Sequence, residues 1–453
     1  MNATAIALNR FGLGARPADA PPTNTQRWLL SQFDAYNPLP GAWQPVPRTS
    51  ALVDAWNTMQ RSVRQAPEGR RSGIREAYLR QGSKAYQAAV GARTNSALQT
   101  ATPFVERLVH FWSNHFAVSV DKLLIVGMAG GFEADAIRPH VLGRFEDLLL
   151  AVVRHPAMLL YLDQAQSTGP RSMMGARAQE GQQRGRGLNE NLAREILELH
   201  TLGVRSGYTQ EDVTEFARAL TGWTLPGDGG AADNATFRFV PALHEPGPRV
   251  VLGRAYAEGG EEQARAVIHD LVATPATALH IARKLARHFV ADEPPQALVQ
   301  RLAETFARTN GDLPSMYREL VSAPEAWQTI GAKFKSPWDW TISSLRALGC
   351  PALTPIRAAG LMTQLGQPVW RPGSPAGYND LTATCAAPDA LMRRVEVAQS
   401  LVQESGGGVD ARSLAPLVLP GALTDGTADA IARAESGGTA LALLLVSPEF
   451  LRR

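Results

Sequence analysis

Apolar residues recur at helical spacing through most of this chain, and this pattern limits its fold more than any other feature. Within 102–117, an apolar stripe follows the i, i+3, i+4, i+7 rule and consists of Leu108, Phe111, Trp112 and His115. The same period returns at 140–153, 156–163, 188–202 and 261–346. Strand patterns occur only at 236–243 and 249–254, which a Glu-Pro-Gly-Pro turn joins. The predicted fold is therefore mainly α, with one small hairpin at about 236–254.

The length of the chain raises the question of domains. Its 453 residues exceed the roughly 250–300 residues at which a single hydrophobic core stops growing. We expect either one helical unit over 1–453 or three parts. The parts would be an N-terminal helical half with the candidate site (1–225), a hairpin insertion (226–260) and a C-terminal helical half (261–453).

Three stretches have the composition of long loops, which often line binding sites. The first, 61–91, is polar and rich in Arg, with 75–81 as an alternative helix. The second, 164–187, is rich in Gly and Arg, and the third, 367–388, is rich in Pro.

Charge and cysteine content exclude several classes of protein. Charged residues make up 19% of the chain and the formal net charge is +3, so neither nucleic acid nor a membrane surface is an expected partner. Two cysteines, Cys350 and Cys385, cannot supply a four-cysteine zinc site. The basic residues include only five lysines, and a preference for Arg codons explains this bias: Lys84, Lys122, Lys284, Lys333 and Lys335.

The apolar runs of the chain are short. The longest, 123–129 and 440–446, fall well below the roughly 20 residues that span a bilayer. The first residues lack a basic leader followed by an apolar run, so the sequence predicts no signal peptide. We therefore expect a cytoplasmic protein without a membrane span, and export together with a partner is the alternative.

The densest polar cluster lies in 189–200. At 100° per residue, Asn191, Arg194, Glu195 and Glu198 share one helix face. Two carboxylates one turn apart can bind a hard cation or divide the roles of general acid and base. We expect Glu195 and Glu198 to be catalytic or metal-binding, with Asn191 and Arg194 orienting the substrate. The alternative is a solvated face with an Arg194–Glu198 ion pair.

A metal at this face would need a ligand from another helix, and His115 is the candidate third ligand. On a regular helix His115 points with the apolar stripe, so a buried core residue is the alternative. Glu106, His110 and Asn114 line up at i, i+4 and i+8 on a different face. A divalent metal is thus an expected cofactor, and the sequence indicates no other.

The Arg-Gly stretch before 188 is a candidate anion site. Arg184 and Arg186 directly precede a helix N-terminus, where backbone amides and guanidinium groups suit phosphate, sulfate or carboxylate. His244 is a further candidate for substrate binding or proton transfer. The alternative for the arginines is a mobile solvated loop. No phosphate-binding Gly-x-x-x-x-Gly-Lys-Ser/Thr, dinucleotide-binding Gly-x-Gly-x-x-Gly or Gly-x-Ser-x-Gly motif is present.

Several of these motifs together resemble one bacterial family, catalogued as domain of unknown function eighteen hundred. The early motifs are 8–17 (Leu-Asn-Arg-Phe-Gly-Leu-Gly-Ala-Arg-Pro), 111–116 (Phe-Trp-Ser-Asn-His-Phe), 155–163, 189–203 and 208–223. The later ones are His244 with 251–253, 335–337 (Lys-Ser-Pro), 365–367, 375–377 and 447–450. One departure is Gly377-Tyr378, where relatives usually carry Gly-Trp.

The resemblance implies a large, mostly helical protein without an established activity. Genes of this family often neighbour one for an exported sulfatase-like protein, which implies a partner or a shared pathway. Relatives often carry an export signal, and this sequence shows none.

Two functional hypotheses follow. In the first, the protein is an enzyme, a metal-assisted hydrolase or oxidoreductase, with its site between the helices that carry Trp112 and Leu188. In the second, it is a non-enzymatic partner or assembly protein for the sulfatase-like neighbour, docking through 164–187 and 367–388. Nucleic-acid binding is not expected, because no basic helix is interleaved with aromatic residues.

Overall fold

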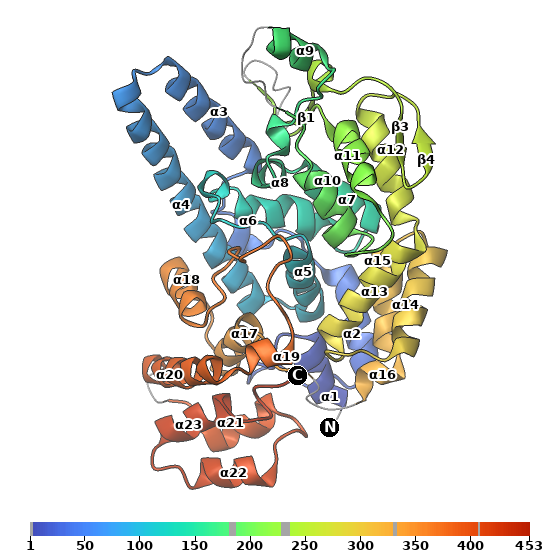
Figure 1. Cartoon of the computed structure of the whole chain (residues 1–453). Coiled ribbons are helices and arrows are strands. Elements are labelled where there is room, and N and C mark those ends of the chain that lie inside the picture. The colour runs from blue at the N-terminus through green and yellow to red at the C-terminus, as the bar shows by residue number, and fades with distance from the viewer. Residues whose placement is uncertain (1–2, 181–186, 228–235, 329–332, 406–407) are drawn as a thin grey trace.

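The computed structural model describes residues 3–180, 187–227, 236–328, 333–405 and 408–453. The fold is mainly α, which confirms the prediction from periodicity (Figure 1). The first eleven α-helices are α1 (Ala3–Ile6), α2 (Thr25–Ala35), α3 (Thr49–Gln65), α4 (Glu68–Gln99), α5 (Pro103–His115), α6 (Ala129–Gly131), α7 (Phe145–Arg154), α8 (Pro156–Tyr161), α9 (Met173–Glu180), α10 (Asn191–Glu195) and α11 (Gln210–Leu220).

The second half of the chain continues with helices. They are α12 (Glu261–Val272), α13 (Pro275–Phe289), α14 (Gln296–Arg308), α15 (Leu313–Ser322), α16 (Pro324–Trp327), α17 (Pro337–Ala347), α18 (Pro355–Gln364), α19 (Thr382–Cys385), α20 (Pro388–Glu404), α21 (Ala411–Val418), α22 (Asp425–Ala432) and α23 (Gly437–Leu445). Short 3₁₀ turns are η2 (Gly41–Trp43), η3 (Leu123–Ile125), η5 (Arg138–His140), η6 (Gln164–Gln166) and η8 (Pro241–Leu243). Across the described ranges, every helix is too short or too polar to cross a bilayer.

Helix α5 lies at the centre of the molecule (Figure 1). Of its residues only Asn114 is not buried, since even the polar Glu106, Arg107 and His110 lie inside the protein. A helix that is covered on all sides belongs to a core rather than a surface. Its polar side chains must therefore find partners within the protein.

The predicted loop at 61–91 is wrong. Residues up to Gln65 end α3, and the rest belongs to α4, which pairs with α3 in a long antiparallel hairpin (Figure 1). Ala, Arg, Gln and Glu have high helix propensity, and the first half of α4 is largely exposed, so this segment needs no apolar stripe. The Trp56 ring packs edge-on against the Tyr78 ring, which ties the two helices together.

Three helices run directly into π-helical turns: η1 (Ala7–Phe11), η4 (Phe132–Ile137) and η7 (Ile196–His200). A π turn uses i→i+5 hydrogen bonds and so holds more residues per turn than an α-helix. The predicted helix at 188–202 is α10 followed by η7, which together span 191–200, and Gly203 (φ +95°) follows after two further residues. Beyond Glu195 the rotation per residue differs from the 100° that was used to place Asn191, Arg194, Glu195 and Glu198 on one helix face.

A small hairpin is present, but its strands pair differently from the prediction. β3 (Arg249–Val251) pairs with β4 (Arg254–Tyr256), while β2 (Arg238–Phe239) pairs with β1 (Trp223–Thr224). Both pairings are antiparallel. Leu252 and Gly253 both have positive φ and form a tight turn that pairs β3 with β4. β2 pairs instead with β1.

The other two predicted loops differ in outcome. Residues 164–187 include the helix α9, so the loop prediction is wrong for that part. Residues 367–381 lack regular structure, as predicted, and only the short α19 follows before α20 begins. A capping box begins α11: the Thr209 side chain accepts from the Asp212 N–H, and the Asp212 side chain accepts from the Thr209 N–H.

Candidate active site

A pocket of about 790 Å³, partly open to solvent, lies beneath the loop 367–380. Its other walls come from α4, α5, α13, the start of α17 and the last residue, Arg453. These segments are far apart in sequence, so the site exists only in the folded chain. This figure includes space open to solvent, and the centre of a water molecule can occupy about 80 Å³ of it.

Asn114, the least buried residue of α5, fixes the loop over the pocket. Its amide nitrogen donates to the Tyr378 carbonyl (2.9 Å) and its amide oxygen accepts from the Tyr378 N–H (2.7 Å). Gly377 has a φ of +82°, and a Cβ there would lie 2.3 Å from the Asn114 carbonyl oxygen. On the other side, the Gln367 side chain accepts from the Trp338 N–H (2.9 Å). The loop is thus held from both ends.

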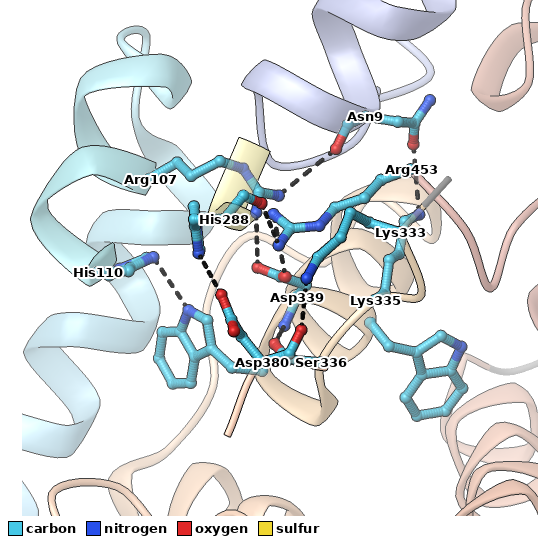
Figure 2. A network of polar contacts seen from close by, with 12 residues as sticks. Asn9, Arg107, His110, His288, Lys333, Lys335, Ser336, Asp339, Asp380 and Arg453 are labelled. Atoms are coloured by element: carbon cyan, nitrogen blue, oxygen red, sulfur yellow. Dashed lines mark hydrogen bonds and ion pairs between the residues drawn. The ribbon is translucent and has the colours of Figure 1, made fainter. Parts of the chain in front are cut away.

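Asp339 is the centre of a buried charge network (Figure 2). Its carboxylate lies 2.9 Å from Arg107 Nη1 and 3.3 Å from Arg453 Nη1. Burial acts to raise the pKa of Asp339, but Arg107 together with His288, His110 and Ser336 outweighs it, and the pKa is lowered. The Ser336 hydroxyl accepts from the Asp339 N–H (3.1 Å) and so caps α17. Asp339 is therefore ionised and fixed in place.

The end of the chain contributes to the same network. Lys333 and Arg453 exchange backbone hydrogen bonds of 3.3 and 2.9 Å, and Arg453 Nη2 donates to the His288 carbonyl (3.0 Å). Lys335 Nζ is buried and donates to Asn9 Oδ1 (3.3 Å) and Ser343 Oγ (3.1 Å). Burial lowers the pKa of Lys335 to about 7. A lysine with no carboxylate at its ammonium is unusual inside a protein.

His288 and Asp380 form a carboxylate–imidazole pair in the pocket wall (Figure 2). His288 Nδ1 lies 3.6 Å from Asp380 Oδ2, and within the described residues His288 Nε2 has no hydrogen-bond partner. Burial lowers the pKa of His288, although Asp380 opposes this. Burial likewise acts to raise the pKa of Asp380, but His288 and the lysines at 333 and 284 lower it to about 2. At neutral pH this is a neutral imidazole beside a carboxylate.

His110 is held in one tautomer. Its Nδ1 accepts from Trp338 Nε1 (3.1 Å), so Nε2 carries the proton and lies 3.5 Å from Glu106 Oε1. Glu106 also pairs with Arg138. With Nδ1 occupied, His110 is suited to orient Trp338 rather than to accept a proton from a ligand.

Arg93 and two tryptophans form the opposite wall. The Arg93 guanidinium carbon lies 4.8 Å from the Trp338 ring centroid and 5.3 Å from that of Trp370. Its Nη1 pairs with the buried carboxylate of Glu133 and donates to Ser113 Oγ (3.1 Å). The wall is therefore flat, aromatic and rigid, since every member is held by another.

The structure places the predicted acidic face of α10 outside this pocket. Arg194 Nη2 donates to Glu190 (3.2 Å) and its Nη1 lies 3.6 Å from Glu198, so the alternative of a helix-surface ion pair is present. Asn191 is exposed. Glu195 is partly buried, and its pKa rises to about 7 through burial and the nearby charge of Glu198, against the effect of Arg194.

His115 lies on the apolar side of α5. It is buried among the rings of Phe111, Trp112, Phe116 and His200, and its Nε2 lies 3.3 Å from the His200 carbonyl. Among the residues that the structure describes, no three or more His, Cys, Asp or Glu side chains are grouped so as to hold a metal ion. Glu195, Glu198 and His115 are not brought together as such a group.

Of the candidate anion residues, His244 belongs to the described part of the chain, and it does not line the pocket. Arg184 and Arg186 are outside the described residues. His244 is buried, and its Nδ1 donates to the Thr221 carbonyl (2.9 Å). Next to it, Glu245 binds Arg171 through the backbone and the side chain, both at 2.7 Å.

Sequence reasoning missed most residues of the pocket. The stripe of Glu106, His110 and Asn114 was recognised as a shared face, and two of these residues line the site. The five lysines were a stronger signal. In a chain that uses Arg almost everywhere, Lys333 and Lys335 are fully buried beside this site. The ammonium group is more compact than a guanidinium group, and a lysine therefore takes less room at a buried position.

The motifs that carry the family resemblance come together here. Asn9, Asn114, Lys335, Gln367 and Gly377 belong to five separate motifs, and each contacts the pocket or its supporting network.

Comparison with known proteins gave one match. The family model described as "Protein of unknown function (DUF1800)" matches residues 6–452, in agreement with the resemblance. The search of curated proteins and the search of solved structures returned no match.

Proposed function

Since the chain belongs to the DUF1800 family, whose function is unknown, we propose from its site that it is an enzyme, a hydrolase that acts on a small molecule bound beneath the loop 367–380. The observation that carries this proposal is the His288–Asp380 pair. The proposal keeps the expected carboxylate–histidine chemistry but assigns it to other residues than Glu195, Glu198 and His115.

The pair has the properties of a general base. Asp380 favours the tautomer of His288 with its proton on Nδ1, which places the lone pair on Nε2, a buried atom without a hydrogen-bond partner among the described residues. The Nδ1–Oδ2 distance of 3.6 Å is longer than a good hydrogen bond, and such contacts commonly shorten when substrate binds. The neutral imidazole can accept a proton at pH 7, and the ionised Asp380 then stabilises the imidazolium.

Water is the nucleophile in this proposal. The two serines that line the pocket are occupied: Ser113 donates to Glu133 (3.0 Å) and Ser336 caps α17. His288 would take a proton from water as the water oxygen bonds to the electrophilic centre. The bond from that centre to the ester oxygen would then break, and the ester oxygen would take the proton back from the His288 imidazolium. Trp338 and Trp370 offer apolar surface for the leaving group.

The test uses three chromogenic esters: p-nitrophenyl acetate, p-nitrophenyl phosphate and p-nitrophenyl sulfate. We expect the wild-type protein to hydrolyse at least one. Asp380→Asn should lower kcat by about 10²-fold or more, because it removes the charge that orients and stabilises His288. Asp389→Asn is the matched control, since Asp389 is exposed on α20 and pairs only with Arg393. Absence of hydrolysis by the wild type, or an unchanged kcat in Asp380→Asn, would refute the proposal.

The acidic face of α10 supports a second candidate. A carboxyl with a pKa of about 7 can donate or accept a proton at neutral pH, and Glu195 also raises the pKa of Tyr161, which is therefore close to it. If this face is catalytic, Glu195→Gln abolishes turnover while Asp380→Asn does not.

The non-enzymatic alternative predicts a different result. A partner or assembly protein for a sulfatase-like neighbour would co-purify with that neighbour and hydrolyse none of the three esters.

A further inference from the structure

A second pocket of about 710 Å³ adjoins the first beneath the same loop. The two share five lining residues: Asn114, His288, Tyr378, Asn379 and Asp380. The His288–Asp380 pair therefore stands where the two spaces meet. A ligand that reaches His288 from one pocket has room to extend into the other.

The second pocket contains two cations from α13, Lys284 and Arg287. Within the described parts of the chain, the Lys284 ammonium makes no hydrogen bond and no ion pair. Arg287 Nε donates to the Asp292 carbonyl (3.1 Å), and among the described residues no carboxylate lies within ion-pair distance of its guanidinium. Both cations thus have donors that the protein leaves unused.

The remaining titratable groups around these cations do not cancel their charge. Asp380 is the one carboxylate among the described residues that line this pocket, and it faces His288. His115, His200 and His280 lie close to Lys284, and burial together with the lysine charge lowers the pKa of each. They are neutral at pH 7, so the pocket carries net positive charge.

The helix fixes the distance between the cations and the base. Lys284 and His288 are four residues apart on α13, and Arg287 is three residues after Lys284, so the three share one side of the helix. One helical turn rises about 5.4 Å. An anionic group held by Lys284 and Arg287 lies on the side of α13 that carries His288.

We propose that Lys284 and Arg287 bind a negatively charged oxygen group of the substrate, a phosphate, sulfate or carboxylate. This inference rests on the proposed hydrolase function and narrows it to anionic esters. The charged group occupies the second pocket, and the bond that is cleaved lies beside His288.

The test measures binding separately from turnover. Isothermal titration of the wild-type protein with inorganic phosphate, sulfate and succinate should show saturable binding of at least one. Lys284→Met should weaken that binding by about tenfold or more, because it removes a charged donor while keeping the length of the side chain. Lys284→Arg should restore much of it. Arg283→Met is the control, since Arg283 is exposed one residue earlier on α13. No binding by the wild type, or equal affinity in Lys284→Met, would overturn the inference.

The two proposals can fail independently. Asp380→Asn should bind the same anion at least as tightly as the wild type, because it removes a nearby negative charge, while its turnover falls. If Lys284→Met loses anion binding and Asp380→Asn keeps full turnover, the anion site stands and the hydrolase assignment to His288 is wrong. If Asp380→Asn loses turnover and Lys284→Met binds anions normally, the substrate class is wrong.

Discussion

Replacing Asp339 by asparagine should strongly destabilise the protein. The carboxylate is the partner of two guanidinium groups, Arg107 at 2.9 Å and Arg453 at 3.3 Å, and all three side chains are at least 93% buried. Removing one partner of a buried ion pair typically costs about 3–5 kcal/mol, because the other charge stays in a medium that solvates it poorly. Asparagine keeps the shape of the side chain and the Ser336 cap, which uses the backbone N–H. We therefore expect a loss of at least about 3 kcal/mol.

The measurement is urea unfolding followed by tryptophan fluorescence, since Trp338 and Trp340 flank the site of the change. Asp389→Asn serves as the control and should shift the free energy of unfolding by less than about 0.5 kcal/mol. Adding Arg107→Met to Asp339→Asn should recover part of the loss, because one of the two uncompensated cations is gone. A loss below about 1 kcal/mol for Asp339→Asn, or no recovery in the double variant, would show that the charges are not what holds these segments together.

Three further predictions concern pH and the loop. The pKa of Lys335 is lowered to about 7 in the folded protein, so between about pH 7 and 10.5 the unfolded chain binds more protons than the folded one. The free energy of unfolding should therefore rise with pH over this range. In Lys335→Met the rise between pH 7 and 9 should be smaller than in the wild type, by up to about 2 kcal/mol. Burial lowers the pKa of His155 to about 3, so the stability that the neutral ring contributes is lost as the pH falls from about 6.5 towards 3. His155→Asn keeps an N-cap on α8. In urea unfolding, its free energy of unfolding should fall less between pH 6.5 and 4 than that of the wild type. Gly377→Ala should loosen the loop 367–380, because the φ of Gly377 is positive and the new Cβ would meet the Asn114 carbonyl oxygen. A protease should therefore cut this variant faster than the control Gly373→Ala, in which no atom lies within 4 Å of the new Cβ. Equal cleavage rates would contradict the attachment of the loop to Asn114.

Local patterns in the sequence predicted the helices well where one side of a helix faces the core. The segment predicted at 156–163 and observed as α8 is an example, since it depends on residues within one or two turns. Helix α4 was missed because its first half is solvated and so carries no apolar stripe. The pairing of β2 was missed because its partner, β1, lies on the far side of an unpatterned stretch.

The site itself was largely beyond local reasoning. It gathers residues near positions 9, 110, 288, 339 and 380, and no spacing along the chain links them. The acidic face of α10 attracted attention because its carboxylates are neighbours in sequence. The π turn that follows Glu195 also changes which side chains share a face, and apolar periodicity does not report such a turn.

The two hydrogen bonds between Asn114 and residue 378 do not depend on the side chain of residue 378. Both hydrogen bonds from the Asn114 side chain go to the main chain of residue 378, so any amino acid except proline at that position keeps the loop 367–380 attached. In this chain the residue is tyrosine, and it lines both pockets. A substitution at residue 378 can thus change the shape of both pockets while the loop 367–380 stays attached to α5.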